Sequence, residues 1–283
     1  MEKIFKKAYE TCKKADVEVF MKYLNTVNPN TELYKIGVRL ANDLFLQACS
    51  LGKLETVEYL CPCIDINTTA TNGSTPLMMA YEHIEVVDFL LKQKGIDINI
   101  QNSLGYTALM YFTKHAKIMK LLLKRPEIEL NTTDENGDSA FLWCAGFNRI
   151  ESAKVLMKTK GVLFDIKNNN GHNALIVAYN DKYFKMVKLI LAANVIDANG
   201  KLDNDCNRFL PMVVLDQRLD ILKLVLKVPN IYVDIKHGNL KTSLDIAIEQ
   251  ENFDIIELLL NREDISPTEQ NMDEIRRLYK KKS

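Results

Sequence analysis

Large apolar residues recur along this chain in pairs that stand four residues apart, with polar residues between them. Val86 and Val87 are followed by Leu90 and Leu91 in this way. The same pattern returns at Ile118/Met119 with Leu122/Leu123, Met186/Val187 with Ile190/Leu191, Ile221/Leu222 with Val225/Leu226, and Ile255/Ile256 with Leu259/Leu260. A helix of 3.6 residues per turn brings residues at this spacing onto one face. The pattern therefore predicts several short amphipathic helices, each with one face to bury.

Two further markers recur between these helices at a fixed interval. The first is a turn glycine, present at Gly73, Gly105, Gly137 and Gly171. These glycines are separated by 105 − 73 = 32, 137 − 105 = 32 and 171 − 137 = 34 residues. The second marker is Asp65-Ile66-Asn67, Asp97-Ile98-Asn99 and Glu129-Leu130-Asn131, again at intervals of 32. Two independent markers with one period indicate a repeat protein.

The residues before each helix predict how a repeat begins. Thr75 and Thr107 read as N-caps, whose side chains accept hydrogen bonds from the first free backbone N–H groups. Pro76 occupies the first helical turn, where its missing N–H has no cost. Each repeat is therefore a turn, a helix, a short loop and a second helix. Since one such unit cannot bury its apolar face alone, neighbours must stack into an elongated all-α solenoid.

The segment Thr75-Pro76-Leu77-Met78-Met79-Ala80 resembles the ankyrin repeat, whose first helix opens Thr-Pro-Leu-His-x-Ala and whose period is about 33 residues. The resemblance implies an all-α, ankyrin-type helix-turn-helix solenoid with turn or hairpin fingers over residues 1–283. It implies seven repeats within 43–265, because the remaining first helices open at positions that keep the same period. The first helices are expected to open near Asp43, Thr75, Thr107, Ser139, Asn173, Arg208 and Thr242.

The two ends of the chain are predicted to close the stack. Residues 1–42 contain two short amphipathic segments, which we interpret as N-terminal capping helices, followed by a break at Asn28-Pro29-Asn30. In residues 266–283, Ser266-Pro267-Thr268-Glu269 reads as a capping box with proline at the first helical position. It is expected to start a C-terminal capping helix that ends in a basic tail.

The chain departs from the family pattern in three respects. The family histidine is absent, so the loop hydrogen bonds that it supplies must be missing or replaced. The second and third repeats, which open at Thr75 and Thr107, lack about two residues between their helices. Cys206 and Leu240 stand where the turn glycine belongs, and both resist the positive φ that glycine accepts, so we expect irregular turns there.

The resemblance implies that the finger tips and the concave face of the first helices bind other proteins. The predicted partner-binding residues are Ser74, Tyr106, Asp138 and His172 at the tips, Met79, Tyr111 and Trp143 within the first helices, and Lys114 and Phe147 near their ends. Tyrosine and tryptophan are enriched among interface residues that carry most of the binding energy. For Met79, Tyr111 and Trp143 the alternative of packing between repeats stays open.

Composition and motifs argue against several other classes of protein. The 37 basic and 37 acidic residues give no net charge, which disfavours a nucleic-acid binder as the leading interpretation. No apolar run approaches the roughly 18 residues of a membrane-spanning helix. The four histidines are scattered, and Cys61-Pro62-Cys63 lacks the second pair of ligands that a zinc site needs. We therefore predict no enzyme activity, no metal and no cofactor.

The resulting hypothesis is a non-catalytic, intracellular protein-interaction module or adaptor that binds a protein or peptide through its concave face. We expect a monomer in the cytoplasm, because Met1–Lys7 lacks a secretory pattern and the six cysteines are too sparse for a disulfide framework. The alternative is a nuclear or nucleic-acid-associated regulatory factor. It rests on the basic cluster at 276–282, which also fits a solvated helix end next to the negative end of the helix dipole.

Overall fold

The computed structural model of the chain describes residues 2–196, 198, 209–229, 231–234 and 241–282. The described residues form helices joined by turns and contain no strand. They divide into two compact units, Met1–Glu135 (unit 1) and Asn136–Ser283 (unit 2). Each unit is described by itself. Within the described ranges, no helix has the length and apolar character needed to cross a membrane.

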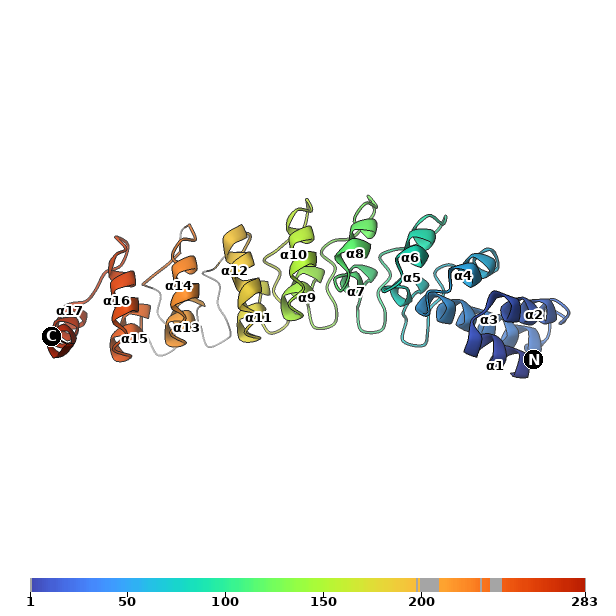
Figure 1. Cartoon of the computed structure of the whole chain (residues 1–283), viewed down its shortest axis with the longest axis horizontal. Helices are drawn as coiled ribbons and strands as arrows, with labels where there is room; N and C mark the ends of the chain where they lie inside the picture. The colour runs from blue at the N-terminus through green and yellow to red at the C-terminus, as the bar shows by residue number, and fades with distance from the viewer. Residues whose placement is uncertain (1, 197, 199–208, 230, 235–240, 283) are drawn as a thin grey trace. The chain divides into compact units, whose positions relative to one another are not determined.

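Among its described residues, unit 1 contains eight α-helices, which are labelled in Figure 1, and one short 3₁₀ turn. They are α1 (Glu2–Thr11), α2 (Lys14–Leu24), α3 (Glu32–Ser50), α4 (Leu54–Leu60), the 3₁₀ turn η1 (Cys61–Cys63), α5 (Pro76–Met79), α6 (Ile84–Leu91), α7 (Ala108–Phe112) and α8 (Ala116–Leu122). The first helices α3, α5 and α7 pack in succession, and so do the second helices α4, α6 and α8. This arrangement is the nearest-neighbour stacking that the apolar pattern predicts.

The N-terminal part of unit 1 confirms one expectation and corrects another. Two short helices, α1 and α2, precede the break at 28–30. The next helix does not open at Asp43. Thr31 caps it instead, accepting a hydrogen bond from the Tyr34 N–H, and α3 runs without interruption for 19 residues. Asp43 lies inside this helix because no capping or turn signal interrupts the sequence on its N-terminal side.

The apolar pairs form the core, as their spacing predicts. Val86, Val87 and Leu90 of α6 are fully buried, and Met119 and Leu122 of α8 are fully buried as well. Burying each such side chain contributes about 1.5–3 kcal/mol relative to leaving it in water. Since helices this short are marginal alone in water, their stability comes from this packing.

The predicted N-caps are confirmed wherever the structure describes them, except at Asp43. Thr75 accepts from the Met78 N–H and has Pro76 directly after it, while Thr107 accepts from the Met110 N–H. In unit 2, Ser139, Asn173 and Thr242 accept in the same way from the backbone three residues on. Arg208, Cys206 and Leu240 lie outside the described residues.

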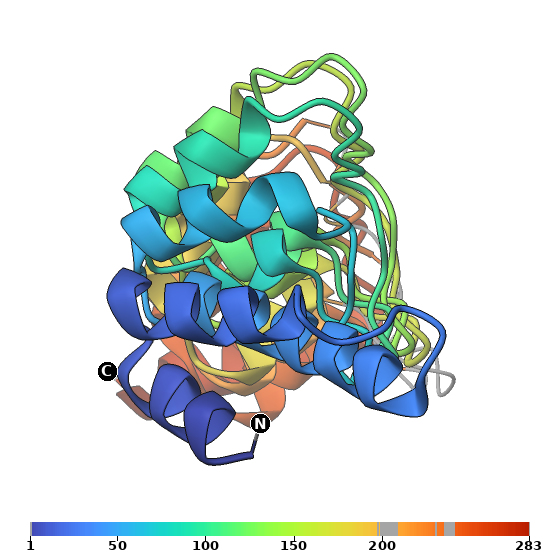
Figure 2. The ribbon, with the colours of Figure 1, turned by 90° about the vertical axis from the view of Figure 1, so that its right-hand side faces the viewer.

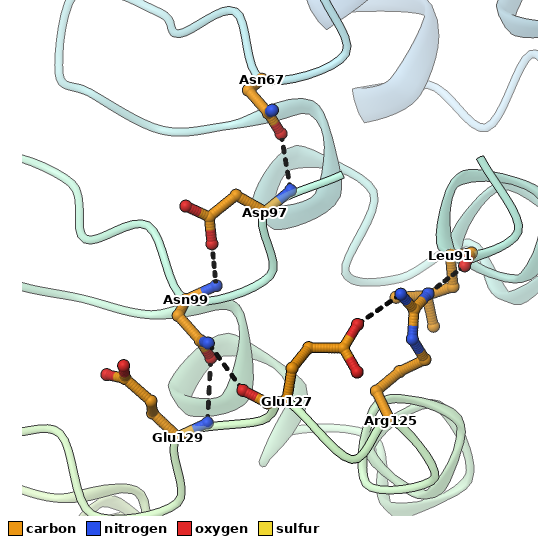
Figure 3. Close-up of polar contacts among 7 residues, drawn as sticks. All are labelled: Asn67, Leu91, Asp97, Asn99, Arg125, Glu127 and Glu129. Carbon is orange, nitrogen blue, oxygen red and sulfur yellow. Dashed lines mark hydrogen bonds and ion pairs between the residues drawn. The ribbon is translucent and has the colours of Figure 1, made fainter. Parts of the chain in front are cut away.

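The asparagine of the Asp-Ile-Asn marker holds neighbouring repeats together (Figure 3). The Asn67 side chain accepts from the Asp97 N–H at 2.9 Å and donates to the Gly95 carbonyl at 2.8 Å. Asn99 makes the same two bonds one repeat later, to the Glu129 N–H and the Glu127 carbonyl. Backbone groups of each loop are thus satisfied by the preceding repeat, which explains why the marker keeps its period.

Unit 2 continues the alternation of first and second helices. Its described helices are α9 (Ala140–Gly146), α10 (Ile150–Met157), α11 (Ala174–Asn180), α12 (Phe184–Ala193), α13 (Phe209–Leu215), α14 (Leu219–Val225), α15 (Ser243–Glu249), α16 (Phe253–Leu260) and α17 (Glu269–Lys282). The helix α9 packs on α11 and α13 on α15, while α10, α12, α14 and α16 pack in succession. Helix pairs are thus the building blocks of both units. The number of repeats stays a prediction.

The turns within helix pairs are of two kinds. In unit 2, Asn148 and Lys182 have φ values of +52° and +61°. The residues after them, Arg149 and Tyr183, donate backward over five residues to the Cys144 and Ala178 carbonyls, both at 2.8 Å. This is the Schellman motif, which satisfies the last carbonyls of a helix.

The pairs α5–α6 and α7–α8 lack the left-handed residue. There the backbone N–H of His83 donates to the Ala80 carbonyl, and the backbone N–H of His115 donates to the Phe112 carbonyl, each over only three residues. The first helices are also shorter, with 4 residues in α5 and 5 in α7, against 7 in α9 and α11. Compared with the unit 2 pairs, the unit 1 pairs therefore lack two residues at the end of the first helix and in the Schellman turn that follows it.

The predicted C-terminal capping box is displaced by two residues. Thr268 caps α17, accepting from the Asn271 N–H at 3.1 Å, and the Asn271 side chain accepts from the Thr268 N–H at 2.8 Å. Pro267 therefore precedes the cap, and the Ser266 N–H donates to Asp234 instead. The box that forms therefore pairs Thr268 with Asn271, in place of the predicted pair Ser266 and Glu269.

Candidate functional site

The predicted binding residues of unit 1 lie on the first helices and on the finger loops, the long turns that precede them. These loops run along one side of the helices (Figure 2). Tyr106 and Tyr111 are half-buried, Met79 is half-buried, and Lys114 is exposed. Met79 and Tyr111 are thus neither fully buried nor fully exposed, and the choice between packing and binding stays a prediction.

Three tyrosines of unit 1 form one aromatic cluster. The Tyr111 ring lies 5.8 Å from the Tyr81 ring and 6.1 Å from the Tyr106 ring, measured between centroids. The His115 ring lies 6.3 Å from Tyr81. Tyr81, Tyr106 and Tyr111 come from two consecutive repeats, so the cluster depends on their stacking. Tilted and edge-on contacts of this kind contribute about 0.5–1.5 kcal/mol beyond burial.

A lysine and a glutamate adjoin the tyrosines. The Lys114 ammonium lies 5.0 Å from the centre of the Tyr81 ring and pairs with Glu82. The hydrogen bond from Lys114 lowers the pKa of Glu82, and the bond to Glu82 raises the pKa of Lys114. Both groups therefore stay charged at neutral pH. The ring face of Tyr81 is thus a position where a cation is already stabilised.

The buried Asn102 fixes the finger loop beneath this cluster. Its side-chain oxygen accepts from the backbone N–H of Leu104 at 3.0 Å and of Tyr106 at 2.9 Å. Its amide lies within hydrogen-bond distance of the Tyr111 hydroxyl, at 3.3 Å, and of the Ser74 hydroxyl, at 3.4 Å. One amide therefore sets the positions of two tyrosines. The sequence patterns do not single out Asn102, although its equivalent Asn168 recurs in unit 2.

Ser74 is not an exposed tip residue. Its exposed fraction is 2%, and the Asn102 amide faces its hydroxyl. Its role is to support the finger. The exposed positions of its own finger loop include Thr71 and Asn72, and those of the next finger loop include Ser103 and Leu104, the latter 51% exposed.

Unit 2 carries a different aromatic arrangement. Trp143 on α9 is half-buried, and its ring lies 5.4 Å from that of Phe147, which is 58% exposed. The Arg149 guanidinium lies 4.7 Å from the centre of the Phe147 ring. These residues come from one helix and its C-terminal turn.

The predicted finger residues of unit 2 are held by Asn168. Its amide donates to the Asp138 carboxylate at 3.0 Å, and its side-chain oxygen accepts from the His172 N–H at 3.1 Å. Asp138 and His172 are both half-buried. The arrangement repeats that of Asn102, so the same buried amide stabilises fingers in both units.

Other side chains stand at the position of the missing family histidine. The Met110 sulfur lies there 3.4 Å from the Thr107 N–H, and the Asp245 carboxylate accepts from the Thr242 N–H at 2.7 Å. The Tyr106 and His172 N–H groups of the fingers donate to Asn102 and Asn168. That these bonds replace those of the family histidine stays a prediction.

Two of the described cysteines, Cys49 and Cys144, are fully buried. Burial raises the pKa of the Cys49 and Cys144 thiols, which keeps them from forming a nucleophilic thiolate at neutral pH. Among the residues that the structure describes, no three or more His, Cys, Asp or Glu side chains gather to hold a metal ion. His237, Asp203 and Asp205 lie outside those residues.

Several side chains of the basic C-terminal cluster have acidic or polar partners. Arg276 pairs with Asp273 at 3.1 Å and Lys281 with Glu251 at 3.4 Å. The Tyr279 hydroxyl donates to Glu257 at 2.9 Å. These contacts fit the interpretation as a solvated helix end. The nuclear alternative stays a prediction.

The stacked pairs of short helices, capped alike and linked by asparagines, define a helical-repeat protein. A family model for ankyrin repeats, comprising three copies, matches residues 11–102, 94–167 and 109–201. The chain belongs to the ankyrin-repeat family, and the predicted fold class is confirmed. A search of curated proteins gave no match. Ankyrin repeats generally mediate protein–protein interaction, and the family is typically non-catalytic.

Proposed function

We propose that this chain is a non-catalytic adaptor that binds a protein or peptide partner through its first helices and finger tips, the concave face of ankyrin proteins. The observation that carries the proposal is the half-exposed cluster of Tyr81, Tyr106 and Tyr111 beside Lys114. Tyrosines that are held rigidly but keep an exposed edge lose little entropy on binding. A cytoplasmic location and a monomeric state are part of the proposal.

The contacts of the cluster support a preformed binding surface. Asn102 fixes the Tyr106 backbone and the Tyr111 hydroxyl, and Lys114 with Glu82 borders the rings with charge. An aromatic centre with a polar border is the usual anatomy of a protein interface. Phe147 and Trp143 are a second aromatic surface in unit 2, which the same partner or another would contact.

The test is affinity capture from native lysate followed by mass spectrometry, with the wild-type chain and the double variant Tyr81→Ala/Tyr111→Ala as baits. Truncating two anchor residues that each contribute about 2 kcal/mol lowers affinity by about 700-fold if the two losses add, so specific partners are lost. The control is Tyr9→Ala/Tyr23→Ala, which removes two tyrosines from α1 and α2. Partners retained by the first variant, with its helical circular dichroism unchanged, would contradict the proposed site.

A further inference from the structure

A groove of about 870 Å³ lies between the C-terminal ends of α4 and α6 in unit 1. It is formed by the second helices and the loops that follow them, whereas the tyrosine cluster belongs to the first helices and fingers. Residues of both polar and apolar character line it, among them Glu58, Cys61, Asp65, Phe89, Lys92 and Gln93. The next interface of the same unit shows which chemistry fills this position.

Between α6 and α8 the equivalent position is filled by an arginine of the chain itself. The Arg125 guanidinium donates to the Leu91 carbonyl at the end of α6 and to the Glu127 carboxylate (Figure 3). Arg125 thus bridges the end of one helix and an acidic residue of the next loop. A planar fork of N–H donors is suited to such a two-sided contact.

Unit 2 repeats this contact with different residues. Arg262 donates to the Leu226 carbonyl of the preceding second helix at 2.7 Å. Its other nitrogens donate to the two oxygens of Asp264 at 2.7 and 2.6 Å, and this bond raises the pKa of Arg262. Two interfaces in separate units therefore use a guanidinium at the same register, two residues after the last apolar pair of the second helix.

At the α4–α6 interface the arginine is replaced by Gln93. Gln93 stands two residues after Leu91, as Arg125 stands two after Leu123. Its amide donates to the Phe89 carbonyl of its own helix at 3.0 Å. In helix register Cys61 corresponds to Leu91, so the end of α4 lacks the bridge that closes the next interface, and the groove remains open there.

We propose that this groove binds an arginine side chain presented by a partner protein. The carboxylates of Glu58 and Asp65 would supply negative charge to a bound guanidinium. The ring of Phe89 would supply a face on which the guanidinium stacks. Lys92 repels a bound guanidinium only weakly, because Asp88 pairs with the Lys92 ammonium at 2.5 Å. Lys94 is the other cation at the groove. The inference is independent of the tyrosine cluster, since it uses other helices and other residues.

The experiment is a titration of the ¹⁵N-labelled full-length chain with the capped peptide Gly-Gly-Arg-Gly-Gly, followed by amide chemical shifts. Saturable shifts are expected at Cys61 and Lys94 and at the Gln93 side chain. The matched peptide with lysine is expected to bind at least fivefold more weakly, because it offers a point charge without a fork. The peptide with citrulline, which keeps the shape without the charge, is expected to bind more weakly still.

Two variants locate the site. Gln93→Arg is expected to fill the groove from within, to abolish the shifts and to raise the unfolding temperature. Glu58→Gln, an exposed change that leaves the fold intact, is expected to raise the Kd about twofold to fivefold. Lys120→Gln, on the exposed side of α8, serves as the control and is expected to leave the Kd unchanged.

Three results would overturn the proposal. They are equal affinity for the arginine and lysine peptides, unchanged binding of the arginine peptide to both Gln93→Arg and Glu58→Gln, and no saturable shift up to about 10 mM peptide. Concentration-dependent self-association that disappears in Gln93→Arg would overturn the partner protein as the occupant of the groove. The arginine would then come from a second copy of this chain. Failure of the lysate experiment on the tyrosine cluster leaves each of these readouts unaffected.

Discussion

The pairs α5–α6 and α7–α8 of unit 1 and the pairs α9–α10 and α11–α12 of unit 2 arise from the same repeat but end their first helices differently. The unit 2 pairs complete seven residues and close with a left-handed residue at Asn148 or Lys182. The unit 1 pairs stop after four or five residues and turn more tightly at His83 or His115. A two-residue deletion therefore shortens a helix without disturbing the buried stripe of the next one.

The deletion also changes where aromatic side chains meet. In unit 2 the Trp143 and Phe147 rings stand four residues apart on one helix, so a complete helix brings them together. In unit 1 Tyr81 follows the end of α5 and meets Tyr111 of the next repeat. The shortened helices thus produce a cluster shared between repeats, whereas the complete helix keeps its rings within one repeat. The following predictions test this contrast, from the largest effect to the smallest.

The largest effect is expected at the end of the short helix α7. Phe112 is fully buried there, whereas α9 has the fully buried Cys144 at the same distance from its N-cap. Phe112→Ala is expected to lower the free energy of unfolding by about 3–5 kcal/mol, since a whole ring is removed from a packed site. Cys144→Ala is expected to cost about 1 kcal/mol, because it removes a single heavy atom. Equilibrium urea unfolding measures both, and equal losses would contradict the contrast.

The next effect concerns the finger glycines, which have almost the same φ in both units. A methyl group added to Gly105, at φ +75°, would stand 2.8 Å from the Asp134 Cα and 2.9 Å from the Glu135 nitrogen. At Gly171, at φ +78°, none of the residues that the structure describes has an atom within 4 Å of such a methyl group. Gly171→Ala is expected to cost about 1–2 kcal/mol from backbone strain. Gly105→Ala adds about 1–3 kcal/mol, because the backbone of the neighbouring finger must shift.

Thermal and urea unfolding of the two glycine variants provide the comparison. Each variant is the control for the other, since the substitution and the backbone conformation are the same. Equal destabilisation would mean that the neighbouring finger yields at no cost. The Glu135 N–H donates to the Leu104 carbonyl at 3.2 Å, and this bond implies firm packing between neighbouring fingers of unit 1. Equal destabilisation would mean that the packing is looser than that.

A smaller effect of opposite sign is expected at the turns themselves. Lys182 has φ +61°, where a side chain is strained, whereas Lys114 of the short pair is not among the residues with positive φ. Lys182→Gly is expected to be about 1 kcal/mol more stable than Lys182→Ala, because glycine accepts the left-handed conformation without strain. Lys114→Gly is expected to be about 0.5–1 kcal/mol less stable than Lys114→Ala. Comparing glycine with alanine cancels the loss of each lysine side chain, and the same sign at both positions would contradict the two turn types.

The sequence predicts most of the repeat skeleton because the relevant signals are local. Apolar pairs, N-cap residues and the period require no knowledge of distant contacts, and Thr75, Thr107 and Ser139 cap helices as expected. Asp43 failed as a helix start because a helix-compatible segment precedes it, and only the position of Thr31 reveals the real start. The finer site was less accessible. Tyr81 and Asn102 act across repeats, so their roles depend on a stacking geometry that periodicity does not specify.

The smallest expected effect is a difference between the two units in how the stability of the fold depends on pH. In unit 2 the Asp220 carboxylate accepts from Arg218, at 3.1 Å to both oxygens, and pairs with Lys188 at 2.9 Å. These bonds, Arg218 first, lower the pKa of Asp220 to about 2. In unit 1 Glu82 has a single basic partner, Lys114, which also lowers its pKa. Both carboxylates are exposed enough for solvent to screen them, so the pairs of Asp220 contribute only about 0.2–1 kcal/mol.

The sign of the acid effect follows from the direction of the shift. A carboxyl with a pKa of about 2 in the folded chain and about 3.9 in the unfolded chain stabilises the fold fully above about pH 5 and loses that contribution as the pH falls toward 2. Lowering the pH from 5 to 3 is therefore expected to reduce the urea midpoint more in the wild type than in Asp220→Asn, with the other carboxylates cancelling in the difference. Glu82→Gln is expected to show a smaller difference, because one lysine replaces an arginine fork and a second lysine. If the wild type and Asp220→Asn lose the same amount, the network around Asp220 contributes nothing to stability, and the two units respond to acid alike.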